Sequence, residues 1–235
     1  TGTKTLNLRM LDNAGTVTWT DGTWSCGGGA TIRNQATGVI DLQGDEALTY
    51  NGYIAVAQIQ NLGLVMKTGG AGVSRLEAAM NNDGTLQIDT GSVDLARGGL
   101  SHGTFIAGAG KGLSFSGGTM TLETNSAVTV AGKVSFTGGP VNVNGGFVVS
   151  DSIVTNSADV KFNGTATVTN LTFSSGYLAG TGRLVVEGAM TWTGGTMQGT
   201  GRTVIQSGAE LVLGGSSDKT LSQRTLENSG TLRWA

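Results

Sequence analysis

Short stretches of alternating apolar and polar residues recur along the whole chain of 235 residues. Apolar side chains alternate with Thr, Ser, Asn or Gln in segments such as 16–19, 85–89, 127–130 and 165–168. A period of two places alternate side chains on opposite faces of an extended chain, which predicts a β-strand over each of these segments. Asn-Gly, Asp-Gly, Ser-Gly and Gly-Gly steps separate the segments and favour tight turns, because Gly and Asn accept positive φ.

The segment 73–80 combines helix-favouring residues with a pattern that also fits a strand. We expect a strand there, because an Asn-Asn-Asp-Gly turn follows it directly. Residues 46–80 as a whole are the least regular part of the chain, and we expect them to contain a longer loop.

Internal repeats connect neighbouring parts of the chain. Residues 171–189 align with residues 190–208 at an offset of 19, and both copies contain the run Gly-Thr-Gly-Arg. A looser pair, 113–122 and 134–143, aligns at an offset of 21. The repeating unit is therefore about 20 residues long, with insertions of one or two residues.

The longest match joins the two ends of the chain. Residues 4–19 and 219–234 are identical at nine of sixteen positions, at an offset of 215. We interpret this as a chain that ends at the phase of the repeat where it began. Residues 1–235 are thus expected to form a single β-solenoid segment excised from a longer repeat array. Neither end resembles a polar capping repeat, so both are expected to expose apolar positions and to allow head-to-tail self-association.

A unit of about 20 residues is too short to bury its own apolar face, so successive units must pack on one another. Two architectures achieve this: a parallel β-solenoid, in which equivalent residues of successive units stack, and a meander of antiparallel hairpins. The repeated Gly-Thr-Gly-Arg run looks like a set of stacked positions and favours the first. The predicted fold is therefore all-β, a right-handed parallel β-helix with roughly 20 residues per coil. In this register Val185 and Val204 are expected to be inward neighbours on successive coils.

Composition narrows the choice of function. Gly contributes 41 residues and Pro only one, with no collagen-like period, so the glycines are expected in turns. Charged residues make up 13% of the chain and the net charge is −2, which removes the electrostatic case for binding nucleic acid. The only cysteine, Cys26, excludes an internal disulfide. No apolar run is long enough for a transmembrane span, and residues 1–20 show no signal peptide.

Candidate chemistry is sparse. His102 is the only histidine, and no G-x-S-x-G motif accompanies it, so we expect no catalytic triad. One histidine and one cysteine are too few for a zinc site, and we expect no metal or other cofactor. The acidic run at residues 41–46 has two interpretations, turn-forming acids or a calcium site, although it lacks the EF-hand ligand spacing.

Three residues are the candidates for ligand binding. Arg183 and Arg202 occupy equivalent positions in the two aligned repeats, and we expect them to face solvent, where they can bind carboxylate or sulfate groups of an anionic glycan. Trp192 aligns with Phe173 and is either a core residue or, if it faces outward, a platform for a sugar ring.

The chain contains two distinctive phrases, N-x-G-T and W-T-G-G-T, in strings such as MNNDGTLQIDTGSVDL and MTWTGGTMQGTG. They resemble the glycine- and threonine-rich repeats of giant bacterial surface proteins of the filamentous-adhesin or autotransporter kind, over nearly the whole chain. The resemblance implies a β-helical segment that is secreted or displayed at the cell surface. It carries over no catalytic residue.

We therefore expect a non-enzymatic structural and adhesive segment of a large bacterial protein, extracellular or at the cell surface, which acts as a stiff stalk. Its expected partners are a polysaccharide or other host or cell-surface ligand, and the neighbouring repeats of the parent protein. The alternative is a polysaccharide-binding module, or a polysaccharide lyase or glycoside hydrolase on a β-helix. Ice binding through threonine ladders is a third function class, disfavoured because the repeats drift.

Overall fold

The computed structural model describes residues 2–235, which form 31 β-strands and no helix. Every pair of neighbouring strands runs parallel. Each strand pairs with its equivalent one coil earlier and one coil later, so the chain winds as a β-solenoid with three strands in each coil. The predicted parallel solenoid is confirmed, and the antiparallel meander is excluded.

The three strands of each coil form three flat faces of the rod. Face 1 contains β1 (Lys4–Asn7), β4 (Thr23–Gly27), β7 (Ala47–Tyr50), β10 (Val73–Leu76), β13 (Ser92–Leu95), β16 (Gly112–Phe115), β19 (Lys133–Phe136), the C-terminal halves of β21 (Gly146–Thr155), β23 (Thr165–Phe173) and β25 (Arg183–Trp192), β28 (Glu210–Leu213) and β31 (Thr231–Trp234).

Face 2 contains β2 (Met10–Asn13), β5 (Thr31–Asn34), β8 (Gln58–Asn61), β11 (Ala79–Asn82), β14 (Gly99–Ser101), β17 (Met120–Leu122), β20 (Pro140–Val143), β22 (Ala158–Phe162), β24 (Gly176–Ala179), β26 (Gly195–Gln198) and β29 (Lys219–Ser222). Face 3 contains β3 (Thr16–Trp19), β6 (Val39–Leu42), β9 (Leu64–Lys67), β12 (Thr85–Ile88), β15 (Thr104–Ala107), β18 (Ala127–Val130), the N-terminal halves of β21, β23 and β25, β27 (Arg202–Ile205) and β30 (Thr225–Asn228).

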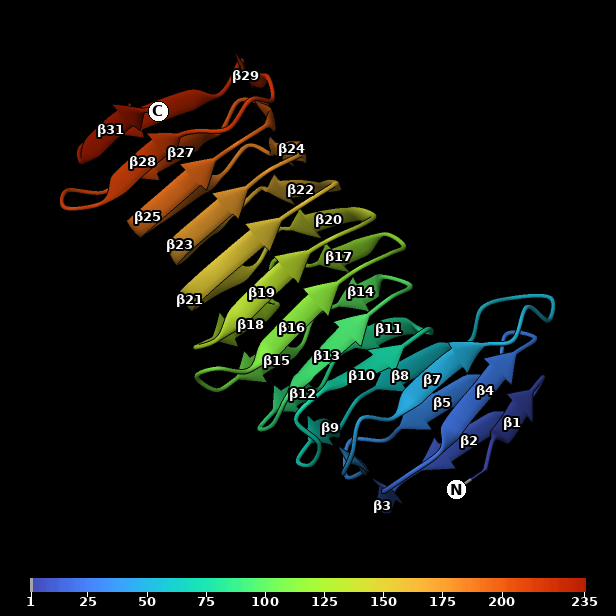
Figure 1. Cartoon of the computed structure of the whole chain (residues 1–235). Coiled ribbons are helices and arrows are strands. Elements are labelled where there is room, and N and C mark those ends of the chain that lie inside the picture. The colour runs from blue at the N-terminus through green and yellow to red at the C-terminus, as the bar shows by residue number, and fades with distance from the viewer. Residues whose placement is uncertain (1) are drawn as a thin grey trace.

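The rod has about 11 turns of roughly 21 residues, close to the predicted unit. In Figure 1 face 1 lies toward the viewer with its strands running to the upper right, and face 2 returns behind it while the chain advances to the upper left. This is a right-handed winding, as the sequence predicts. At about 4.8 Å per strand spacing, eleven turns extend on the order of 50 Å. Within residues 2–235 there is no helix long and apolar enough to cross a membrane.

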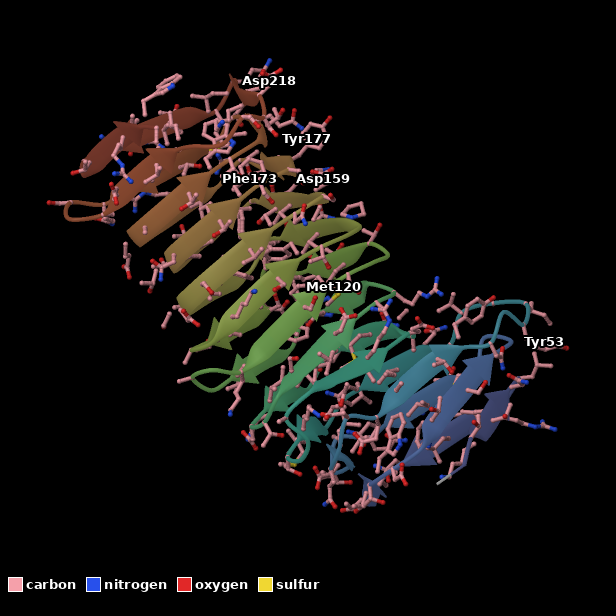
Figure 2. The ribbon with its side chains drawn as sticks, viewed as in Figure 1. Tyr53, Met120, Asp159, Phe173, Tyr177 and Asp218 are labelled. Atoms are coloured by element: carbon pink, nitrogen blue, oxygen red, sulfur yellow. The ribbon has the colours of Figure 1, made fainter. Side chains whose placement is uncertain are left out.

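The irregular region predicted at residues 46–80 contains the longest coil. Ala47 of β7 pairs with Arg75 of β10, an interval of 28 residues, and a strandless loop at 51–57 takes up the extra length. The side chain of Tyr53 projects from this loop at the edge of the ribbon (Figure 2). Residues 73–80 form β10 and the start of β11, so the expectation of a strand is confirmed.

Inward side chains of successive coils stack to fill the interior. The phenylalanines Phe115 and Phe136 stack with ring centroids 5.5 Å apart, and Phe147 and Phe162 continue the cluster. All four rings are fully buried. Offset and edge-to-face ring contacts of this kind add to the free energy of burying apolar area.

One feature of the expected register is wrong. Val185 and Val204 do pair on successive coils and are both buried. However, Leu184 and Val186 belong to the interior cluster, so Val185 between them must point outward. The reason is the strict alternation of a β-strand, which the sequence LVV does not display because all three residues are apolar.

The near-copies at the two ends fold alike but lie on different faces. Residues 4–19 form β1, β2 and β3, and residues 219–234 form β29, β30 and β31 with the same spacing. Leu8 and Gln223, at equivalent corners, both have positive φ, 54° and 60°. β1 lies on face 1 and β29 on face 2, so the second copy is displaced by one third of a turn. The expectation that the chain ends at its starting phase is therefore wrong.

Candidate functional site

The structure places Trp192 inside the rod. The ring is 3% exposed, stacks on Phe173 with centroids 6.1 Å apart, and donates its Nε1–H to the carbonyl oxygen of Gly194 at 3.0 Å. A ring in this position offers no face to a sugar, so the core alternative is the correct one for Trp192.

Arg183 and Arg202 pair on successive strands of face 3 and are both exposed, as expected. The guanidinium of Arg202 forms an ion pair with Glu227 on the next coil. Among residues 2–235, no hydrogen bond or ion pair holds the side chain of Arg183. The two arginines are therefore surface neighbours on face 3, one paired and one free, whereas Trp192 lies on face 1 and points into the rod.

A shallow trough on the outer surface of face 1 is lined largely by polar residues. It crosses β10, β13, β16 and β19 and has a volume of about 430 Å³. Short polar side chains line most of it. The lining includes Ser92, Ser114, Ser116, Ser135 and Thr137, together with Val73, Arg75, Asp94, Gly112, Leu113 and Lys133. Hydroxyl groups, one cation and one ion pair are the groups that bind sugar hydroxyls and acidic sugars.

Asp94 and Arg75 form the fixed part of this trough. Arg75 Nη1 donates to Asp94 Oδ2, and the hydroxyl of Ser116 donates to the same oxygen at 2.9 Å. Asp94 is 6% exposed, and its other oxygen, Oδ1, has no hydrogen-bond partner. Arg75 also contacts Glu77 at 3.2 Å, so its guanidinium links two carboxylates along face 1.

A second polar cluster lies at the corner between faces 3 and 1, where Lys67 packs against the acidic run 41–46. Lys67 is fully buried, although it ends a strand whose equivalents in later coils are apolar. Its Nζ donates to the carbonyl oxygen of Gly44, to Asp45 Oδ1 at 3.0 Å and to Ser74 Oγ at 3.0 Å. All three N–H donors of this ammonium group are thus satisfied, as a buried charge requires.

Two carboxylates of the acidic run, Asp41 and Asp45, accept hydrogen bonds from neighbouring protein groups. Asp41 accepts hydrogen bonds from the hydroxyl of Thr68 at 2.6 Å and from the amide of Gln43 at 2.7 Å. Asp45 accepts from Lys67 and from the backbone N–H of Gly72 at 2.9 Å. These partners favour the interpretation as turn-forming acids. Across residues 2–235, no group of three or more His, Cys, Asp and Glu side chains is arranged to hold a metal ion.

Glu46 differs from its acidic neighbours. It is 4% exposed, and within residues 2–235 no other side chain donates a hydrogen bond to its carboxylate. Burial raises the pKa of the Glu46 carboxyl, and backbone N–H groups of Glu46 and Gly44 together with the positive charge of Lys67 partly offset this.

An asparagine ladder follows the corner between faces 2 and 3. Asn13 donates to Asn34 at 2.8 Å, Asn34 to Asn61 at 2.9 Å, and Asn61 to Asn82 at 2.7 Å. Each amide also donates to backbone carbonyls at the corner, and the last three asparagines are fully buried. The glycines two residues after Asn61 and Asn82 lie against the coil before them. A Cβ on Gly84, for example, would collide with the carbonyl oxygen of Gly63. In the N-x-G phrase, the Asn therefore joins the ladder and the Gly allows close contact between coils.

His102 lies outside this corner and forms no triad. Its Nδ1 is 2.8 Å from Asp83 Oδ1, and both side chains are largely exposed. The neighbouring Ser101 points into the rod, where its hydroxyl donates to the carbonyl oxygen of Asn82 at 2.8 Å. No nucleophile faces the imidazole in the described part of the chain, so these residues do not assemble the machinery of acyl transfer.

Sequence reasoning missed the trough, the Lys67 cluster and the asparagine ladder. The ladder had a visible marker, since three of its four asparagines, Asn13, Asn61 and Asn82, are followed two residues later by Gly. The trough had none, because Ser and Thr line every face. The buried lysine could be found only from the register, which places Lys67 in an inward column between Leu42 and Ile88.

Comparison of the chain with protein-family models, with curated proteins and with solved structures finds no match. The resemblance to bacterial surface repeats therefore stays a prediction from the sequence phrases.

Proposed function

We propose that this chain is a stiff, non-enzymatic structural segment of a bacterial protein that is secreted or displayed at the cell surface, where it carries other modules and makes adhesive contacts. The observation that carries the proposal is the unbroken stack of parallel strands. Face 2 alone links eleven strands in sequence, from β2 to β29, and the other two faces extend beside it.

Stiffness follows from the way the coils are joined. Each inner coil bonds through three strands to the coil before it and through three to the coil after it. The interior adds stacked rings in the central coils and an asparagine ladder in the first coils. Bending the rod would open these contacts on one side, and each lost buried hydrogen bond is costly.

The stalk role can be tested by small-angle X-ray scattering and electron microscopy of the purified chain. We expect a straight particle whose maximum dimension matches about eleven coils and changes little between low and high salt, since few charged contacts link the coils. A flexible or compact particle contradicts the proposal.

A second candidate function is the binding of an acidic polysaccharide in the trough of face 1. The carrying observation is the combination of Arg75, Asp94 and Lys133 with serine and threonine hydroxyls in one elongated depression. Arg75 is committed to two carboxylates, whereas the amino group of Lys133 has no ion pair within the described residues, so Lys133 is the cation available to a ligand. Arg183 and Arg202 would add a separate, weaker contact for anionic sugars on face 3.

Binding to a panel of acidic and neutral polysaccharides, with release of reducing ends measured in parallel, separates the candidates. We expect acidic polysaccharides to bind without being cleaved. Lys133→Ala should lower their affinity for the protein more than a double Arg183→Ala, Arg202→Ala variant does. Lys161→Ala, which removes a lysine from face 2, is the matched control. Cleavage would support the lyase or hydrolase alternative, and equal binding by all variants would exclude the trough.

A further inference from the structure

Charge is distributed unevenly along the trough of face 1. Its strands β10, β13, β16 and β19 lie side by side toward the viewer in Figure 1 and follow one another at about 4.8 Å. Arg75 on β10 forms an ion pair with Asp94 on β13, and Lys133 lies on β19 at the other end. Two strand spacings, on the order of 10 Å, therefore separate Asp94 from Lys133 along the rod.

The middle of the trough is open and uncharged. Gly112 stands in the outward column between Ser92 and Lys133. A Cβ on Gly112 would lie 2.8 Å from the Cβ of Ser92, so the glycine keeps this part of the trough open. Within residues 2–235, no protein group forms a hydrogen bond with four hydroxyls of the lining, those of Ser92, Ser114, Ser135 and Thr137. These hydroxyls are therefore available to the hydroxyl groups of a ligand.

The two cations of the trough differ in what they already bind. The guanidinium of Arg75 is committed to two carboxylates, one of which is Asp94. The amino group of Lys133 has neither an ion pair nor a hydrogen bond in the described part of the chain. Lys111 and Arg97 are close in sequence to lining residues but do not line the trough. The trough therefore offers one free positive charge, at β19.

Asp94 makes the opposite end unfavourable for an anion. Its side chain is only 9% exposed, and its Oδ1 has no hydrogen-bond partner. A buried carboxylate with an unmatched oxygen favours hydroxyl donors and repels a second negative charge. Val73 lies at the same end and is 53% exposed, so it offers apolar contact area to the C–H groups of a neutral sugar ring.

Building on the candidate binding function of the trough, we propose that its ligand is a polysaccharide in which at least two neutral sugars follow each acidic one. The acidic sugar binds at Lys133, and the neutral sugars lie over β16 and β13. An extended sugar chain advances by about one strand spacing per ring, so consecutive rings along the rod fall on consecutive coils. A chain with an acid on every ring would place one beside Asp94, where no free cation balances it. Asp94 is thus the residue that determines specificity.

Calorimetric titration with equally long fragments of gellan, polygalacturonate and dextran tests the selection. In gellan several neutral sugars separate the uronates, whereas every sugar of polygalacturonate is a uronate and dextran is neutral. We expect gellan fragments to bind at least about tenfold more tightly than either of the others. If polygalacturonate binds as tightly as gellan, the binding function stands and the proposed selection is wrong. If no acidic fragment binds, the binding function fails and the selection fails with it.

Asp94→Asn tests the source of the selection. The substitution keeps the shape of the side chain, removes its negative charge and frees Arg75 for a ligand. Polygalacturonate should then gain at least about tenfold in affinity, a change that a misfolded protein cannot produce. Asp159→Asn is the matched control, because Asp159 lies on face 2 and also has an Oδ1 without a partner; it should bind all three fragments like the wild type. An Asp94→Asn variant that rejects polygalacturonate as strongly as the wild type does overturns the proposal.

Discussion

The first coils and the central coils share one backbone but have different interiors. At the corner between faces 2 and 3, the inward column begins with Asn13, Asn34, Asn61, Asn82 and Ser101, and continues with Leu122, Val143 and Phe162. On face 1, Glu46 and Ser74 hold positions that Val93 and Leu113 occupy in later coils.

This difference shows that stacking, rather than apolar character, is what the solenoid requires of an inward residue. A column can be filled by apolar side chains, whose burial is favourable at each coil. It can equally be filled by amides, provided that each donor and acceptor finds a partner on the next coil. A column with one unmatched group, such as Glu46, is costly.

The largest expected effect is in the central coils. Phe136 contacts Phe115, Phe147 and Phe162 and is fully buried. Phe136→Ala should lower the free energy of unfolding by about 3–5 kcal/mol, through lost burial and the cavity that remains. Urea denaturation followed by circular dichroism measures it. Tyr177→Ala, which truncates an aromatic side chain that is 46% exposed, should change stability far less.

The asparagine ladder should be the next most sensitive. Asn61→Ala removes the amide that accepts from Asn34 and donates to Asn82 and to the carbonyl oxygen of Thr85, and it leaves these buried groups short of a partner. A loss of about 2–4 kcal/mol is expected. Hydrogen exchange should show the loss in the first coils, with the central coils still protected. Asn163→Ala breaks an exposed Asn–Asn bond to Asn144 and is the control; equal losses would contradict the role assigned to burial.

The contrast between the two interiors also explains how much of the fold could be predicted. Strands, turns and stacking followed from period-two patterns and from repeats such as 171–189 and 190–208. The side on which a residue lies was predictable only where polar and apolar residues alternate. It failed at Val185, which has apolar neighbours on both sides, and at Lys67, whose inward position contradicts its charge.

The candidate site was predicted less well for a physical reason. Face 1 collects Arg75, Asp94 and Lys133 from coils about 20 residues apart, and their approach depends on the length of every intervening coil. A shift of one residue in any coil would turn such a side chain inward. Repeat alignments fix that register only where the coils resemble each other, as they do around Arg183 and Arg202.

Lys67 tests whether the first coils tolerate an apolar residue in a polar corner. Lys67→Met keeps the length of the stem but leaves Glu46 without a nearby positive charge, so a loss of about 2 kcal/mol is expected. Thermal unfolding measures it. Adding Glu46→Gln to the variant should restore only the part of the loss that comes from the Glu46 carboxylate, because the contacts of Lys67 with Asp45, Ser74 and the carbonyl oxygen of Gly44 stay lost. An additive second loss would show that Glu46 is stabilised by groups other than Lys67.

Glu46→Gln alone should change the free energy of unfolding least, but the direction of the change with pH is clearly defined. The fold raises the pKa of Glu46, so the native chain binds its proton more tightly than the unfolded chain does. Between the ordinary glutamate pKa of about 4.3 and the raised value, the native state therefore holds more protons, and stability falls as the pH rises. Gln cannot ionise and escapes this loss. The variant should match the wild type in acid and become the more stable of the two as the pH approaches neutrality. Urea denaturation of both chains at a series of pH values measures the difference. If the wild type is the more stable at neutral pH, the buried carboxylate is paired after all, and the first coils follow the rule of the asparagine ladder without exception.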